Sequence, residues 1–211
     1  SFIGNIFSYC LTSIYNVSQI SPLFLGDSGL TSLRHRTTPL IPNKAHPSFY
    51  YLDLRGISVN GKAIPLPKGT FQLKPNGKGG LIIDSGTTLT YLEDPAYQPL
   101  LHAVRASITS RAVNSSSVGL DLCYKKVKRS ALRLPKIAFH FGGGSRYVLP
   151  TQNSFMTVES GTDVLLCFAF ASAGPAGSSS VFGNVQQQNF HIAYDLGQNQ
   201  LHFAHTNCAS L

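Results

Sequence analysis

Hydrophobic and polar residues alternate with a period of two in several segments of this chain, a pattern typical of half-buried β-strands. One such segment is 48–67, and Asn60-Gly61 within it is a strong signal for a two-residue type I′ hairpin, because both central residues of that turn need positive φ. Residues 134–141 also alternate and end at three glycines, and 190–203 indicates a second hairpin. These patterns predict a mainly β chain.

One segment has a helical pattern. Apolar side chains recur at helical spacing within 94–108, where Asp94 is the expected cap and Pro95 suits the first helical position. Pro99 removes a backbone hydrogen bond, so the regular part of the helix is expected to begin there. Further along the chain, 164–171 is a nearly continuous apolar run and is predicted to be one buried strand.

The composition fits one packed domain. Hydrophobic residues make up 43% of the 211 positions and charged residues 12%, with 13 Phe and 9 Tyr, which favours a β-rich domain over a disordered chain. We see no internal repeat and no linker, so residues 1–211 are expected to form a single domain of antiparallel sheets with one or two short helices. No apolar run approaches the roughly 18–20 residues of a membrane span, so no membrane partner is predicted.

The formal charge of +8 raises the question of a nucleic-acid or acidic partner. The charge results mainly from a scarcity of acids, 9 against 17 bases, and the densest basic cluster, Lys125 to Arg129, is expected to be a solvated loop. Neither zinc-finger spacing nor interleaved aromatic and Arg residues occur. The 7 His show no metal-binding spacing. We therefore predict no metal and no cofactor, and nucleic-acid binding is disfavoured.

Four widely spaced cysteines include no C-x-x-C pair, which argues against a metal or redox site. They are Cys10, Cys123, Cys167 and Cys208. Four cysteines allow three pairings, and the spacing does not choose among them. Asn16 and Asn114 each begin an N-x-S sequon and are candidate glycosylation sites. Together these features predict an oxidising, secretory route.

The tripeptide Asp-Ser-Gly occurs twice. The first copy, 27–29, resembles the nucleophile segment of serine proteases, but no His precedes it and a turn explains it. The second copy, 84–86, follows the fully apolar 81–83 and precedes two threonines and another apolar segment. An acid at the end of a buried strand is costly unless it is hydrogen-bonded, and the small residues after Asp84 supply hydroxyls and open amides. An ordinary turn capped by Asp84 explains the same pattern equally well.

Residues 83–88, Ile-Asp-Ser-Gly-Thr-Thr, resemble the second active-site motif of pepsin-family (A1) aspartic proteases. The longer stretch through residue 92 is similar to the plant nepenthesin-like branch of that family. Further similar segments are 7–11, 50–59, 180–188 and the ending 194–208. The resemblance thus covers essentially the whole chain. It implies the C-terminal lobe of the bilobal pepsin-like fold, without the N-terminal lobe, and the activity of an aspartic endopeptidase.

The resemblance also implies a role for each residue of this motif. Asp84 would be a catalytic aspartate, and Thr87 would hydrogen-bond the outer oxygen of its carboxylate. Ser85 would join the reciprocal bonds that lock two active-site loops together. Gly86 and Thr88 would line the substrate cleft.

The resemblance also implies one residue that supports the site and a pairing of the cysteines. The segment that ends at Gly183 matches the family's apolar-apolar-Gly strand beside the catalytic loop, where a side chain would collide. Among the three possible pairings of the cysteines, the family implies Cys10–Cys208 and Cys123–Cys167.

The family mechanism needs two aspartates that share one proton around a water. The ionised aspartate acts as base and the protonated one polarises the peptide carbonyl, as is well established for aspartic proteases. This chain carries one of the two, so we predict a partner N-terminal lobe with the other Asp, a peptide or protein substrate, and negligible proteolysis by the isolated chain. A fragment, a processed subunit and a truncated product are all consistent with this. The first residues lack the features of a signal peptide, and an extracellular or vacuolar location is predicted.

Two other functions compete with the endopeptidase. Cereal xylanase inhibitors share this fold and resemble the same half, so a non-catalytic inhibitor of glycoside hydrolases is the alternative. They have lost the catalytic geometry, whereas this chain retains the complete 84–88 string, which favours the enzyme. DNA binding is the third hypothesis, because some relatives of this plant branch have been described as nucleoid DNA-binding. A steep salt dependence of DNA retention would support it.

Overall fold

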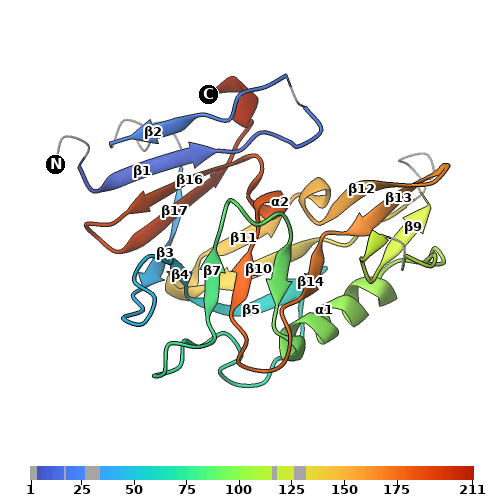
Figure 1. The fold of residues 1–211 in the computed structure, drawn as a ribbon, viewed down its shortest axis with the longest axis horizontal. Helices are drawn as coiled ribbons and strands as arrows, with labels where there is room; N and C mark the ends of the chain where they lie inside the picture. Colours follow the sequence, from blue (N-terminus) through green and yellow to red (C-terminus); the bar gives the residue numbers. More distant parts are fainter. Residues whose placement is uncertain (1–3, 17, 27–33, 116–117, 126–131) are drawn as a thin grey trace.

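The computed structural model describes residues 4–16, 18–26, 34–115, 118–125 and 132–211. Its strands form three sheets, accompanied by one long helix and several short helical turns (Figure 1). The predicted mainly β fold with few helices is confirmed. The first Asp-Ser-Gly and most of the basic cluster that begins at Lys125 lie outside the described residues.

The largest sheet has ten strands and carries the candidate site. Its strand order is β14-β8-β15-β7-β4-β3-β17-β16-β1-β2. In that order the bounds are Phe170–Ser172, Thr90–Leu92, Ser180–Phe182, Leu81–Ile83, Tyr51–Leu52, Arg36–Ile41, Gln200–His205, Phe190–Asp195, Ile6–Cys10 and Leu23–Leu25. Most neighbours are antiparallel, as predicted, but β14 with β8 and β15 with β7 are parallel. Because β15 lies between β7 and β8, it passes beside the turn that joins them.

Two smaller sheets complete the fold. Their orders are β11-β10-β5-β6 and β12-β13-β9. The bounds are Arg146–Leu149, Ile137–Phe141, Leu54–Val59 and Lys62–Ala63 for the first, and Phe155–Ser160, Asp163–Phe168 and Cys123–Lys125 for the second. The short helical turns are η3 (Gly142–Gly144), η4 (Thr151–Asn153) and η5 (Cys208–Ser210).

Both predicted hairpins are confirmed. Strands β5 and β6 pair beside the predicted turn, in which Asn60 has φ 50 and Gly61 has φ 81. Strands β16 and β17 pair along their whole length. The surrounding segment 48–67 nevertheless divides between two sheets, because β4 joins the ten-stranded sheet instead of continuing into β5.

Two local predictions are wrong. The run 164–171 is two strands, β13 and β14, in different sheets, because the Ala169 N–H leaves the ladder to donate to the Ser154 carbonyl. Helix α1, Asp94–Ala106, runs through Pro99 without a break, and its cap is Glu93. Its buried face compensates for the bond that Pro99 loses, since four of its residues lie in the core.

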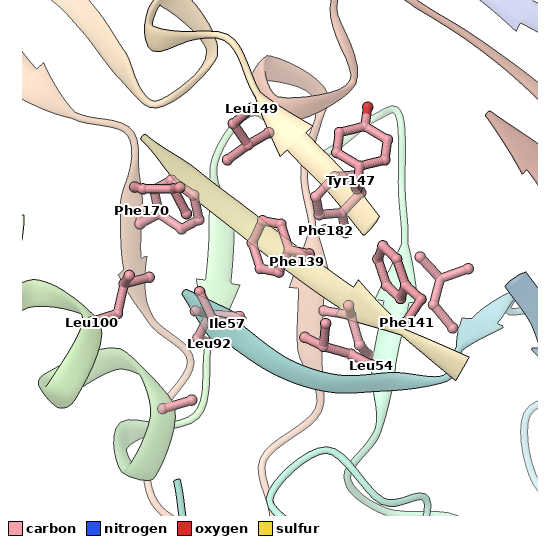
Figure 2. Packing of buried hydrophobic residues seen from close by; sticks show 14 of the residues in the cluster. Leu54, Ile57, Leu92, Leu100, Phe139, Phe141, Tyr147, Leu149, Phe170 and Phe182 are labelled. Carbon is pink, nitrogen blue, oxygen red and sulfur yellow. The ribbon is translucent and has the colours of Figure 1, made fainter. Parts of the chain in front are cut away.

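The core packs the four-stranded sheet against strands of the ten-stranded sheet (Figure 2). Phe139 of β10 is fully buried and meets Phe182 of β15 edge to face, with ring centroids 5.3 Å apart. On its other side the ring centroid of Phe139 lies 6.2 Å from that of Phe170 of β14. Leu100 of α1 lies at this end of the cluster. Aromatic pairs of this kind contribute about 0.5–1.5 kcal/mol beyond the area they bury. The core thus fixes β15 in its place next to the candidate site.

Two disulfides cross-link the fold. One joins Cys10 of β1 to Cys208 of η5, and the other joins Cys123 of β9 to Cys167 of β13. These are the pairs that the resemblance implies. In the described part of the chain no helix combines the length and the apolar character that a membrane crossing needs.

Candidate active site

The site is built at the end of β7, where a buried strand delivers an acid to the surface. Leu81 and Ile83 are buried, whereas Asp84 is exposed. The Ile83 N–H donates to the Tyr50 carbonyl at 3.0 Å, and the Asp84 N–H donates to the Phe182 carbonyl at 3.1 Å. Strands on both sides of β7 therefore hold the backbone on which the carboxyl group stands. In Figure 1 this turn lies at the upper end of β7, beside α2.

Each carboxylate oxygen of Asp84 accepts one hydrogen bond within the turn. The Gly86 N–H donates to Oδ1 at 2.8 Å, and the Thr87 hydroxyl donates to Oδ2 at 2.6 Å. Hydrogen bonds to an ionised acceptor are stronger than neutral ones, so they limit the rotation of the group. The Thr87 bond is the one that the resemblance implies. The Gly86 N–H is one of the open backbone amides that the sequence analysis expected this turn to supply.

Gly183 directly follows β15 and lies beside the segment that joins β7 to β8. A Cβ atom there would overlap the main-chain carbonyl of Leu89, as predicted for this position. The Gly183 N–H donates to the Thr90 hydroxyl at 2.9 Å, which joins the end of β15 to the start of β8. Only glycine allows the two backbones to approach this closely.

Helix α2, Asn184–Gln187, follows Gly183 and holds the turn by its main chain. The N–H groups of Asn184 and Val185 donate to the carbonyls of Thr87 and Thr88 at 2.6 and 3.0 Å. The side-chain amide of Asn184 donates to the Ser85 carbonyl at 2.9 Å. Ser85 and Thr88 are exposed, so the implied bond of Ser85 to a second loop and the implied cleft position of Thr88 remain predictions.

A buried amide below the turn was missed by the sequence analysis. The Nε2 group of Gln187 donates to the main-chain oxygen of Asp84 at 3.1 Å and to that of Phe182 at 2.8 Å. Its Oε1 accepts from the Tyr9 hydroxyl at 2.5 Å. The signal was present in the sequence: three consecutive glutamines follow a strand and a glycine, and buried amides need partners.

An aromatic cluster on the β1 side borders the site. Tyr194 stacks on Phe7 with centroids 4.5 Å apart and lies 4.8 Å from the ring of Tyr50. Burial raises the pKa of Tyr9 and of Tyr194, and the negative charge of Asp84 adds to this in both. Both phenols therefore remain protonated and able to donate. Among the described residues no three His, Cys, Asp or Glu are grouped as a metal site would require.

Comparison with known proteins agrees with this geometry. The model of the Xylanase inhibitor C-terminal family matches residues 49–205. Aspartic proteinase nepenthesin-1 of Nepenthes gracilis is 40% identical over 208 residues, which are 97% of this chain and 46% of the relative. Aspartyl protease family protein 2 of Arabidopsis thaliana is 37% identical over 206 residues, 96% of this chain and 41% of the relative. The chain thus spans less than half the length of these relatives.

Solved structures agree on the fold. The crystal structure of edgp superposes with a TM-score of 0.78 at 21% identity, covering 99% of this chain and 56% of that one. The crystal structure of Basic 7S globulin from soybean superposes with a TM-score of 0.75 at 15% identity, covering 98% of this chain and 53% of that one. Because the family model matches residues 49–205, the chain belongs to the Xylanase inhibitor C-terminal family. Its curated relatives are named plant aspartic proteases, and the family model that it matches describes a C-terminal part.

Proposed function

We propose that this chain is the C-terminal lobe of an aspartic endopeptidase and that Asp84 is one of its two catalytic carboxyl groups. The observation that carries the proposal is the Asp84 carboxylate itself. It stands exposed at the end of a buried strand, and a backbone amide and a hydroxyl orient its two oxygens. The main chain of the same turn is held in addition by α2 and by the buried amide of Gln187.

In the proposed reaction Asp84 and an aspartate of the partner lobe hold a water between them. One carboxylate takes a proton from the water, whose oxygen attacks the peptide carbonyl carbon while the other, protonated, carboxyl polarises the carbonyl oxygen. The carbon–nitrogen bond then breaks, and the leaving nitrogen takes up the proton that the base carboxyl group removed from the water. The contribution of this chain is to hold one carboxyl group in a fixed direction, which reduces the reorganisation needed during the reaction.

The partner in this proposal is an N-terminal lobe. Asp84, Ser85 and Gly86 are exposed together, so a second surface can reach all three. The edge strand β2 also exposes Leu23 and Leu25, by 66% and 55%. Exposed apolar side chains on the edge strand of the described sheet favour coverage by another stretch of polypeptide.

The test is proteolysis of denatured globin at acid pH by the complete two-lobed enzyme and by its Asp84→Asn variant. We expect Asp84→Asn to lose at least about 1,000-fold in kcat, since a triad or dyad member is worth that much or more. The isolated 211-residue chain is expected to show negligible activity. Pepstatin-sensitive cleavage by the pure chain, or full activity of Asp84→Asn, would contradict the proposal.

A non-catalytic inhibitor of glycoside hydrolases is the second candidate, and the family model that matches residues 49–205 favours it by its description. The same preparations distinguish the two. Tight binding to a xylanase, with unchanged affinity in Asp84→Asn and no proteolysis by the complete protein, would establish the inhibitor instead.

A secretory location is also part of the proposal, as extracellular or vacuolar protein. Both disulfides support it, because such bonds persist in oxidising compartments. Asn16 and Asn114 are both exposed, as glycosylation requires, and the Ser18 hydroxyl of the first sequon donates to the Asn16 side chain at 2.9 Å.

A further inference from the structure

Beneath the catalytic turn, Gln187 is fully buried and its amide is fully occupied. Both Nε2 protons are used, one on the main-chain oxygen of Asp84 and the other on that of Phe182. Turning the amide over would point its oxygen at two carbonyl oxygens, which is strongly unfavourable for a buried group. Gln187 therefore holds the Asp84 peptide group to β15 in one orientation.

The hydroxyl of Tyr9 fixes the other end of this amide. Gln187 Oε1 can only accept, so the proton of the 2.5 Å bond comes from Tyr9. Tyr9 and Tyr194 lie 3.2 Å apart, oxygen to oxygen, and because the Tyr9 proton is already used, Tyr194 is the donor in that contact. The bonds thus run in one direction, from Tyr194 through Tyr9 to Gln187 and on to the backbone of Asp84.

This connection joins two distant parts of the chain. Tyr9 lies on β1, and 178 positions separate it from Gln187, which is in turn 103 positions from Asp84. Strand β1 is anchored independently, by its pairing with β16 and by the Cys10–Cys208 disulfide. Asp84 is therefore connected through Gln187 and Tyr9 to strand β1, in addition to the hydrogen bonds within its own turn.

We propose that Gln187, oriented by Tyr9, is a positioning residue for the Asp84 carboxyl group. The inference rests on the proposed endopeptidase function. Gln187 contacts the main chain of Asp84 and not its carboxylate, so its removal lets the peptide group rotate and displaces the carboxyl by a fraction of an ångström to about 1 Å. Displacements of that size reduce turnover by about 100-fold without removing any reacting group.

The test compares Gln187→Met and Tyr9→Phe in the complete two-lobed enzyme. Gln187→Met keeps the length of the side chain and removes all three hydrogen bonds, and we expect kcat to fall by about 10- to 100-fold with KM within twofold of wild type. Tyr9→Phe removes one hydroxyl and should reduce kcat by a smaller factor than Gln187→Met does. It also keeps the proposal testable if Gln187→Met does not fold.

Matched controls remove hydrogen bonds of two other buried side chains, neither of which bonds to the Asp84 turn. Tyr97→Phe removes a buried hydroxyl that donates to Asp121 at 2.6 Å, and Asn43→Leu removes a buried amide that donates to the Gly77 carbonyl at 3.0 Å. Both should lower the melting temperature as the test variants do and leave kcat within about twofold.

The outcomes separate the two proposals. If wild type shows no proteolysis that depends on Asp84, the proposed function fails and the positioning role fails with it. If wild type is active and Asp84→Asn is inactive, but Gln187→Met and Tyr9→Phe keep kcat as the controls do, only the positioning role is overturned. A rise in KM with unchanged kcat would likewise overturn it, since that indicates loss of substrate binding.

Discussion

Acidification from pH 7 to pH 4 is expected to weaken the fold through one buried histidine, His191 of β16. Its Nε2 lies 2.9 Å from the Ser8 hydroxyl, and its Nδ1 lies 2.8 Å from Nε2 of His35. Burial, and after it the charge of His35, lowers the pKa of His191 to about 4. On the paired strand β17, burial also lowers the pKa of His202, against the opposing charge of Asp195.

The sign and size of the effect follow from the difference between the folded and unfolded chains. The ordinary pKa of histidine is 6.5, so between pH 6.5 and 4 the unfolded chain binds a proton that the folded chain does not. The free energy of unfolding therefore falls as the pH falls through this window. A pKa difference of one is equivalent to about 1.4 kcal/mol, and because local relaxation and hydration reduce the full value we expect a loss of about 2 kcal/mol.

Urea unfolding at pH 7, 5.5 and 4 measures this loss directly. His191→Gln keeps a hydrogen-bonding side chain but cannot be protonated, so it should lose about 2 kcal/mol less than wild type between pH 7 and pH 4. His46→Gln changes an exposed histidine and should follow wild type. Equal losses in wild type and His191→Gln would refute the reasoning.

Two further predictions concern the backbone and the disulfides. Gly183→Ala should destabilise by more than about 3 kcal/mol in thermal unfolding, because the methyl group overlaps the Leu89 carbonyl. Gly56→Ala, whose methyl meets nothing within 4 Å, should change stability by less than about 0.5 kcal/mol, and equal melting temperatures would contradict this account. Replacing Cys10 and Cys208 by Ser should cost about 1 kcal/mol more than replacing the other pair, since the bridges span 198 and 44 positions. Denaturant titration measures both costs, and the reverse order would argue against loop entropy as the cause.

Local chemistry was sufficient for part of the fold and of the site. Asn60-Gly61 predicted its turn because positive φ at two adjacent positions leaves few residue choices. Asp84 stood out because an apolar strand ends on an acid, and the pattern alone left its meaning open between a capped turn and a catalytic group. The resemblance, which rests on residues across the whole chain, was needed to choose between them.

What the sequence analysis missed depends on contacts between distant segments. Nothing within 164–171 shows that Ala169 bonds to Ser154 and divides the strand. Pro99 was expected to start the helix because propensity is a local quantity, whereas the buried face of α1 is set by the sheets against which it packs. Gln187 and Tyr9 meet only in the folded chain.

The position of β15 between β7 and β8 has a consequence for the order of folding. Hydrogen bonds that hold the Asp84 turn span 99 and 103 positions, so closing them requires a long loop to lose its freedom. During synthesis, a polypeptide that has reached residue 179 contains the whole turn but neither the strand nor the amides that orient it. We therefore expect the acid to acquire its direction late, so that unfinished molecules expose a carboxyl group without an ordered site.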